Sequence, residues 1–321
     1  MAATGDNRVT HDRCPLGAAT VRERRATHTS YAATFSGIRF LAVGLILTLP
    51  AGPPATRAQQ PQNPSPMVEH TRAHARLPEQ APPGRHEKLD VGTLFVPDGL
   101  KADSAEILFF FHGDTSIPEE AAARDKVAVV SVQAGAGSAV YARLFEDPQR
   151  FLRLLHEAEE KAGANFGRVM LGGWSAGCGA IRQILKTPES YARVRAVLLI
   201  DGIHTDYTDG KPGPLESQLD AGNLQIWMQL FRDAIAGRKR VIVTHSEIFP
   251  GTYASTTETA DYLLAQLGVR RHAVLKWGPM GMQQLSEAEA GKFLLLGFAG
   301  NSAPDHVDQL NALPALLKRL R

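Results

Sequence analysis

The segment Gly173-Trp174-Ser175-Ala176-Gly177 constrains the fold of this chain more than any other stretch. It follows an apolar run at 169–171 and precedes a segment whose apolar residues recur at helical spacing and which stops before Pro188. A G-x-S-x-G pattern between a strand and a helix is typical of a nucleophile elbow, in which a sharp turn exposes the serine hydroxyl at the edge of a sheet. Strand and helix approach so closely there that only glycine fits two residues either side. The pattern therefore predicts that Ser175 is a nucleophile.

Apolar runs and amphipathic segments alternate along the chain on both sides of this turn. Continuous apolar runs, such as residues 107–111, indicate strands that are buried on both faces. Alternation with helices predicts an α/β fold, with a mostly parallel sheet covered by helices on both faces. Strands are expected at 91–96, 107–111, 127–132, 168–172, 194–200, 239–244, 273–277 and 293–298, with the last two as a hairpin.

A longer insertion lies between Asp201 and Arg238. The apolar residues of 224–235 within it predict an amphipathic helix. Two interpretations stay open at this point, because such a helix either caps a site at the sheet edge or simply packs on the sheet.

The first 58 residues have the composition of a signal peptide. A basic stretch comes first, an apolar run at 40–49 follows, and Thr56-Arg57-Ala58 offers a small–x–small cleavage site. The apolar run is too short to span a bilayer comfortably. We therefore expect cleavage near Ala58 and export to the periplasm or the outside, with no stable membrane span left; an uncleaved membrane anchor is the alternative.

Residues 59–86 are rich in proline and lack apolar periodicity, which predicts an extended, disordered linker. The folded domain is then expected over residues 87–321. The net charge of the whole chain is only +2, which gives no indication of a nucleic-acid partner. Two cysteines, Cys14 and Cys178, are too few for a disulfide framework.

A serine nucleophile needs a base, and the base needs an acid to orient it. His272 and His306 are the two histidines beyond residue 250. His272 precedes a strand and is assigned a structural role, whereas His306 lies in a polar loop after the last strand and is the candidate base. Two carboxylates end neighbouring strands, Asp201 and Glu247, and the sequence does not decide which of them is the acid.

The oxyanion needs N–H donors, and the residue after the nucleophile, Ala176, should supply one of them. The second is expected from Gly113 or Asp114, in the loop after the strand at 107–111. His112 is interpreted as a structural hydrogen-bonding residue. A metal site at His204, Asp206 and His245 is conceivable, but the spacing matches no established ligand pattern, so no metal is predicted.

Taken in order, Phe111-His112-Gly113, the G-x-S-x-G pattern and Asp305-His306 resemble the α/β-hydrolase superfamily over residues 87–321. The resemblance implies an eight-stranded, mostly parallel sheet and acyl transfer through an acyl-enzyme. In the fold predicted here, the helical insertion follows the sixth strand. Asp114 departs from the superfamily's HGGG motif, and a glutamate acid would be a less common variant.

These features together predict an exported serine hydrolase that acts on a small-molecule or polymer-linked carboxylic ester and needs no cofactor. Two alternatives remain. One is a peptidase or acyltransferase that uses the same residues, and the other is a secreted binding protein with a degenerate hydrolase fold. The sequence says nothing about the oligomeric state.

Overall fold

The computed structural model describes residues 73–78, 81–208 and 218–321, all of which belong to one compact unit, 57–321. The predicted signal peptide, its cleavage site and the linker up to residue 72 lie outside the described residues. None of the helices in the described ranges has the length and apolar character that crossing a membrane requires.

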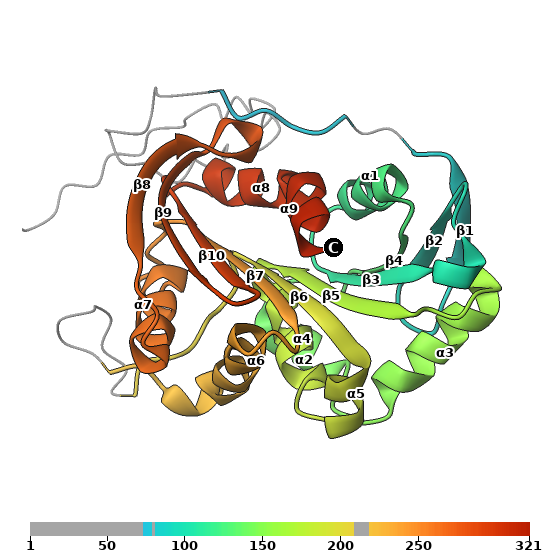
Figure 1. Cartoon of the computed structure of the whole chain (residues 1–321), viewed down its shortest axis with the longest axis horizontal. Helices are drawn as coiled ribbons and strands as arrows, with labels where there is room; N and C mark the ends of the chain where they lie inside the picture. Colours follow the sequence, from blue (N-terminus) through green and yellow to red (C-terminus); the bar gives the residue numbers. More distant parts are fainter. Residues whose placement is uncertain (1–72, 79–80, 209–217) are drawn as a thin grey trace, which may run out of the picture. The chain divides into compact units, whose positions relative to one another are not determined.

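The described part is built on a single mixed sheet of ten strands (Figure 1). The six central strands run parallel to one another, and antiparallel strands flank them on both sides. In spatial order the strands are β1 (Gly84–Lys88), β2 (Thr93–Pro97), β4 (Ala128–Val132), β3 (Glu106–Phe111), β5 (Arg168–Trp174), β6 (Val194–Ile200), β7 (Arg240–His245), β10 (Phe293–Phe298), β9 (Gln283–Ala290) and β8 (His272–Trp277).

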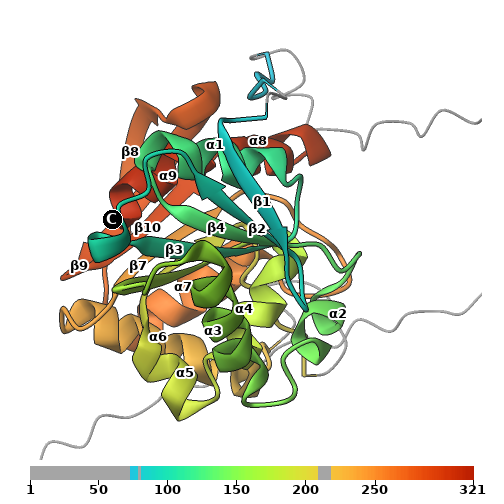
Figure 2. The same ribbon diagram turned by 90° about the vertical axis from the view of Figure 1, so that its right-hand side faces the viewer.

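Helices cover both faces of this sheet (Figures 1 and 2). One face carries α1 (Ser116–Asp125), α8 (Ala303–Asn311) and α9 (Leu313–Leu320). The other face carries α2 (Ser138–Arg143), α3 (Arg150–Ala162), α4 (Cys178–Ile184), α5 (Pro188–Arg193), α6 (Gln225–Ile235) and α7 (Thr256–Leu267). The predicted fold class is therefore confirmed.

Apolar residues of the central strands alternate between two hydrophobic cores, one on each face of the sheet. In β3, Phe109 and Phe111 belong to the core beneath α3, whereas Leu108 and Phe110 belong to the core beneath α1 and α9. All four side chains are fully buried, which explains why the run reads as continuously apolar in the sequence.

Helix α6 packs on the sheet, which answers the question left open for residues 224–235. Its Trp227, Leu230 and Phe231 are buried in the core, and the Phe231 ring lies 4.7 Å from that of Phe293 in β10. These apolar residues therefore stabilise the fold and do not form a movable apolar cap.

Three expectations about the strands were wrong. Strand β1 starts at Gly84, inside the linker predicted for residues 59–86, because residues 84–88 pair with β2. The strands at 273–277 and 293–298 do not form a hairpin, because β9 lies between β8 and β10 and pairs with both. β9 is rich in glutamate and alanine and carries little strand signal, and together with β1 it raises the sheet to ten strands instead of eight.

Candidate active site

The turn after β5 has the geometry that its sequence predicts. β5 ends at Trp174, a short 3-10 turn covers Ser175–Gly177, and α4 follows directly. Ser175 has a φ of +50°, a left-handed conformation that non-glycine residues rarely adopt. A Cβ at Gly177 would lie 2.0 Å from the carbonyl oxygen of Phe111, so only glycine lets the turn come this close to β3.

Backbone strain gathers at the carboxyl ends of three adjacent strands. Besides Ser175, His112 after β3 has a φ of +71° and Asp201 after β6 has a φ of +44°. These are three of the five non-glycine residues with positive φ in the described ranges. Each such residue costs on the order of 1–3 kcal/mol and persists because the surrounding structure holds it, and such residues cluster at functional sites.

Asp201 and His306 form a closely coupled pair. The Nδ1 of His306, in α8, lies 2.7 Å from Oδ2 of Asp201. The other carboxylate oxygen of Asp201 accepts hydrogen bonds from the Ser246 N–H at 2.9 Å and the Thr256 hydroxyl at 2.8 Å. Burial alone would raise the pKa of Asp201, but the hydrogen bond and charge of His306, together with the bonds from Ser246, lower it to about 2. Asp201 is therefore ionised and can hold the imidazole in one tautomer.

Trp174 ties His306 to the serine turn. The Trp174 indole N–H donates to the His306 carbonyl oxygen at 3.0 Å, and the two rings lie 4.6 Å apart. On the other side, a Cβ at Gly202 would lie 2.4 Å from the Ser175 carbonyl oxygen, so the segment after Asp201 packs directly on the turn. The structure thus brings Ser175, Asp201 and His306 to one edge of the sheet.

The other sequence candidates lie elsewhere. Glu247 is exposed, and its backbone N–H donates to the Gly300 carbonyl oxygen at 2.9 Å. His272 is exposed on the edge strand β8. Of the two carboxylates left open by the sequence, Asp201 is the one that holds His306.

Among the predicted oxyanion donors, Ala176 lines the pocket beside Ser175. Gly113 has a φ of +102° and packs against Leu310 and Trp174, while the Asp114 carboxylate accepts from the Ser116 N–H at 2.8 Å. The second donor stays a prediction.

The structural role expected for His112 agrees with its contacts. Its Nδ1 is hydrogen-bonded to the Tyr141 hydroxyl at 2.9 Å, and its ring stacks on Trp174 at 5.0 Å. Burial and, secondarily, the positive charge of His306 lower the pKa of His112. His112 therefore fixes the turn after β3 beside the candidate site as a neutral group.

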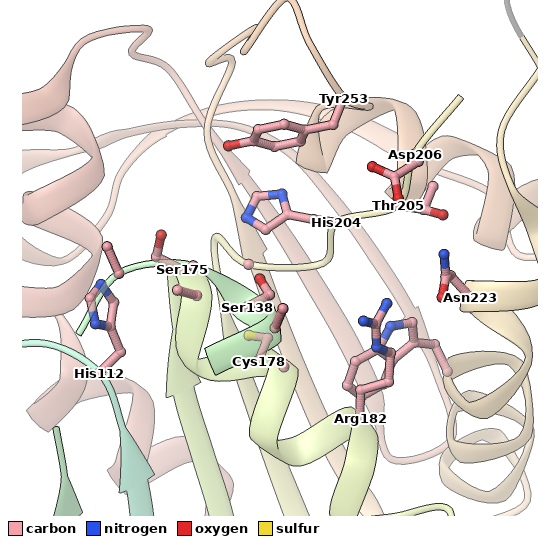
Figure 3. Close-up of a pocket in the computed structure, with 17 residues that line it drawn as sticks. His112, Ser138, Ser175, Cys178, Arg182, His204, Thr205, Asp206, Asn223 and Tyr253 are labelled. Atoms are coloured by element: carbon pink, nitrogen blue, oxygen red, sulfur yellow. The ribbon is translucent and has the colours of Figure 1, made fainter. Parts of the chain in front are cut away.

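A pocket of about 470 Å³ opens next to Ser175 (Figure 3). Sequence reasoning missed most of its wall, which includes Ser138, Arg182, Asn223 and Tyr253. His204 also lines the pocket, and burial lowers its pKa to about 4. The one signal that the sequence offered was for Arg182, because it lies in the helix that directly follows the serine turn.

Cys178 also borders the pocket but is not a competing nucleophile. It is buried, and burial raises the pKa of its thiol, which donates to the Gly173 carbonyl oxygen at 3.4 Å. Cys178 is therefore not a candidate nucleophile.

The conceivable metal site at His204, Asp206 and His245 does not assemble as a ligand set. Both ring nitrogens of His245 lie close to protein groups, with Nδ1 3.0 Å from the Ser246 carbonyl oxygen and Nε2 2.7 Å from Arg271. Within the described ranges, the group of side chains with metal-ligand spacing is His74, Asp305 and Asp308, and Arg76 forms an ion pair with Asp308 there.

No protein-family model and no curated protein matches the chain. Solved structures are similar to this chain only at low identity and low TM-score. An acetyl xylan esterase from Aspergillus awamori matches with a TM-score of 0.42 and 16% identity. The match covers 70% of this chain and 93% of the esterase chain. An S-formylglutathione hydrolase from Agrobacterium tumefaciens has a TM-score of 0.42 and 13% identity, covering 74% of this chain and 94% of its own.

A third similar structure, a carboxylesterase from Bacillus subtilis, has a TM-score of 0.40 and 9% identity, covering 74% of this chain and 90% of its own. Likenesses at this level carry no argument about activity. The chain's own topology does define its fold class, because a serine turn after β5, an acid after β6 and a histidine after the last strand follow the order Ser…Asp…His of the α/β-hydrolase fold.

Proposed function

We propose that the protein is a serine hydrolase that cleaves a carboxylic ester through an acyl-enzyme. The observation that carries this proposal is the Asp201–His306 hydrogen bond of 2.7 Å beside the strained turn that bears Ser175. A serine hydroxyl is a poor nucleophile at neutral pH, and an imidazole oriented by an ionised carboxylate is the arrangement that activates it.

In the proposed mechanism, the Ser175 hydroxyl oxygen attacks the acyl carbon of the ester while His306 Nε2 takes the hydroxyl proton. Asp201 accepts the Nδ1–H of His306 and stabilises the imidazolium that forms. N–H groups of Ala176 and of Gly113 or Asp114 stabilise the oxyanion. His306 then returns the proton to the leaving alcohol. A water molecule next attacks the acyl carbon while His306 takes its proton, and His306 returns this proton to Ser175 as the carboxylic acid leaves.

The replacement Ser175→Ala tests this proposal. In a serine hydrolase, removing the nucleophile lowers kcat by roughly 10⁶-fold. We expect a loss of this order on a short-chain nitrophenyl ester, with an unchanged melting temperature. A Ser175→Ala protein that keeps full activity would end the proposal.

A fluorophosphonate probe separates the enzyme from a non-catalytic binding protein of the same fold. The probe should attach to Ser175 in the wild-type protein, as located by mass spectrometry of the labelled peptide. The matched control Ser138→Ala removes another serine of the same pocket and should still be labelled. Parallel assays with amide substrates and acceptor alcohols distinguish an esterase from a peptidase or acyltransferase.

We also propose that the enzyme is exported, on the strength of the basic and apolar segments before Ala58. Amino-terminal sequencing of the protein recovered from outside the cytoplasm should begin after Ala58. Recovery of the full-length chain from the cytoplasm would refute this part of the proposal.

A further inference from the structure

The proposed reaction leaves the one arginine of the pocket, Arg182, without a role. Arg182 lies on α4 and lines the pocket next to Ser175. Across the described ranges, its guanidinium forms no ion pair or hydrogen bond with a protein group. Arg182 is only partly exposed, and a partly buried guanidinium is stabilised when an anion pairs with it.

Polar groups surround the same part of the pocket. His204 Nδ1 is buried and, among the described residues, has no hydrogen-bond partner. Asn223 lines the same wall and donates its side-chain N–H to Asp220 at 2.8 Å. In Figure 3, Arg182 and Asn223 lie on the side of the pocket away from His112, and His204 lies between Ser175 and Tyr253. This end of the pocket suits a polar group at the end of a ligand better than an apolar one.

The pocket also contains one acidic residue, Asp206. Its side chain is exposed, so water solvates its charge, whereas Arg182 is more deeply placed. The two side chains form no ion pair with each other. The positive charge of the inner wall is therefore left for a ligand.

The position of His306 indicates which half of the ester enters this pocket. His306 must reach the leaving alcohol to return its proton, so the alcohol lies on the His306 side of Ser175. The residues that line the pocket include Ser175 and Ala176 but not His306. The acyl half is thus the part that extends into the pocket toward Arg182.

Helix geometry sets the length of this acyl half. Arg182 follows Ser175 by seven residues, three through the 3-10 turn and four along α4, and rises of about 2.0 and 1.5 Å per residue separate their Cα atoms by about 12 Å along the helix axis. An extended acyl chain of about the length of suberate spans a comparable distance.

We propose that the pocket binds an acyl group that ends in a carboxylate, with Arg182 as the partner of that carboxylate and His204 as a neutral hydrogen-bonding group beside it. This inference rests on the proposed ester hydrolysis and names its substrate class, the half esters of dicarboxylic acids.

The test compares two 4-nitrophenyl esters of equal chain length, the half ester of suberic acid and the uncharged octanoate. The wild-type enzyme should prefer the half ester in kcat/KM by about 10- to 100-fold, as expected for hydrogen bonds to a charged group. Arg182→Gln should remove most of this preference by raising KM for the half ester, and Arg182→Lys should retain part of it.

Arg195→Gln is the matched control, because Arg195 is exposed at the end of β6 that lies away from Asp201. This variant should leave the preference for the half ester unchanged. Equal cleavage of both esters by the wild-type enzyme would refute this inference alone. Faster cleavage of the octanoyl ester of 4-hydroxybenzoate than of the half ester would also refute it, because the carboxylate would then belong to the alcohol. Failure to cleave any ester, together with no fluorophosphonate labelling, would refute the proposed function as well.

Discussion

Helix α8 takes part in two histidine–aspartate pairs of the same geometry, and only one of them lies at the candidate active site. His306 Nδ1 lies 2.7 Å from Asp201 Oδ2, and His74 Nδ1 lies 2.7 Å from Asp308 Oδ2. In both pairs the carboxylate is almost fully buried and the imidazole is partly exposed, with side-chain exposures of 22% for His306 and 31% for His74. The short distance therefore does not by itself mark a catalytic pair.

The surroundings of the two pairs differ in charge. Asp308 also forms an ion pair with Arg76, which offsets its negative charge independently of the imidazole. Asp201 instead accepts hydrogen bonds from two neutral groups, an N–H and a hydroxyl. The partner that can become positively charged beside it is therefore His306. A carboxylate whose only charged partner is the imidazole can stabilise a transient imidazolium. A carboxylate that is already paired with a guanidinium stabilises the imidazolium less.

The surroundings also differ in what the imidazole can reach. The His306 ring lies against the ring of Trp174, the residue before the strained serine. His74 belongs instead to the segment 73–78 that contacts α8. The comparison teaches that backbone strain and a serine turn with a pocket next to it distinguish the candidate active site from a structural contact.

The largest expected difference between the two pairs appears when the charge of each carboxylate is removed in turn. Asp201→Asn should lower kcat by about 10⁴-fold, because the amide favours the wrong imidazole tautomer. Asp308→Asn should leave kcat unchanged within about twofold and lower the free energy of unfolding by about 1–3 kcal/mol. Steady-state kinetics and urea denaturation of both variants measure this difference.

Glu247→Gln completes this set, because Glu247 is the carboxylate that the sequence left as an alternative acid. Its exposed position predicts wild-type turnover. If Glu247→Gln lost as much activity as Asp201→Asn, the assignment of the acid would be wrong.

An effect of intermediate size is expected from pH, through the titration of His204 in the pocket. Because the pKa of His204 is lowered to about 4 from an ordinary value of 6.5, the unfolded chain binds this proton more readily. The neutral, buried His204 therefore contributes fully to the free energy of unfolding above pH 6.5. This contribution, at most about 3 kcal/mol, is lost as pH falls toward 4. Urea denaturation at pH 7 and pH 4.5 should show a smaller loss for His204→Gln than for the wild-type protein, and equal losses would contradict the burial of this ring.

The smallest expected effect lies at the second pair. Arg76 is 38% exposed, so solvent screens its attraction to Asp308. Arg76→Ala should lower the free energy of unfolding by less than about 1 kcal/mol and leave ester cleavage unaffected. A loss of activity in this variant would show that the two pairs on α8 are coupled.

Local signals in the sequence sufficed for the centre of the fold. The strand at 107–111, the serine turn and the strand at 194–200 follow from apolar runs and glycine spacing, and the structure has them at these positions. The edge strands did not follow, because β9 pairs on both sides through its backbone and its half-exposed face needs few apolar residues.

The candidate site was predictable only in part for a similar reason. Ser175 and His306 stand in recognisable local contexts, but the choice between Asp201 and Glu247 depends on which loop turns toward α8. That choice is made by the positive φ of Asp201 and by its bonds to Ser246 and Thr256, which are contacts between segments far apart in the chain. The pocket wall was missed because His204 and Asn223 meet Arg182 only after folding.

The double contact of Trp174 with His306, through its indole N–H and through its ring, has a consequence for how this fold tolerates change. The alignment of α8 with the serine turn is set where they touch and does not depend on the length of the chain that connects them. Insertions between residues 202 and 300 can therefore accumulate in surface loops without shifting the histidine, so long as the indole and its acceptor are kept. Replacing the indole by a smaller ring would remove this hydrogen bond and weaken the ring contact even if every connecting loop stayed the same.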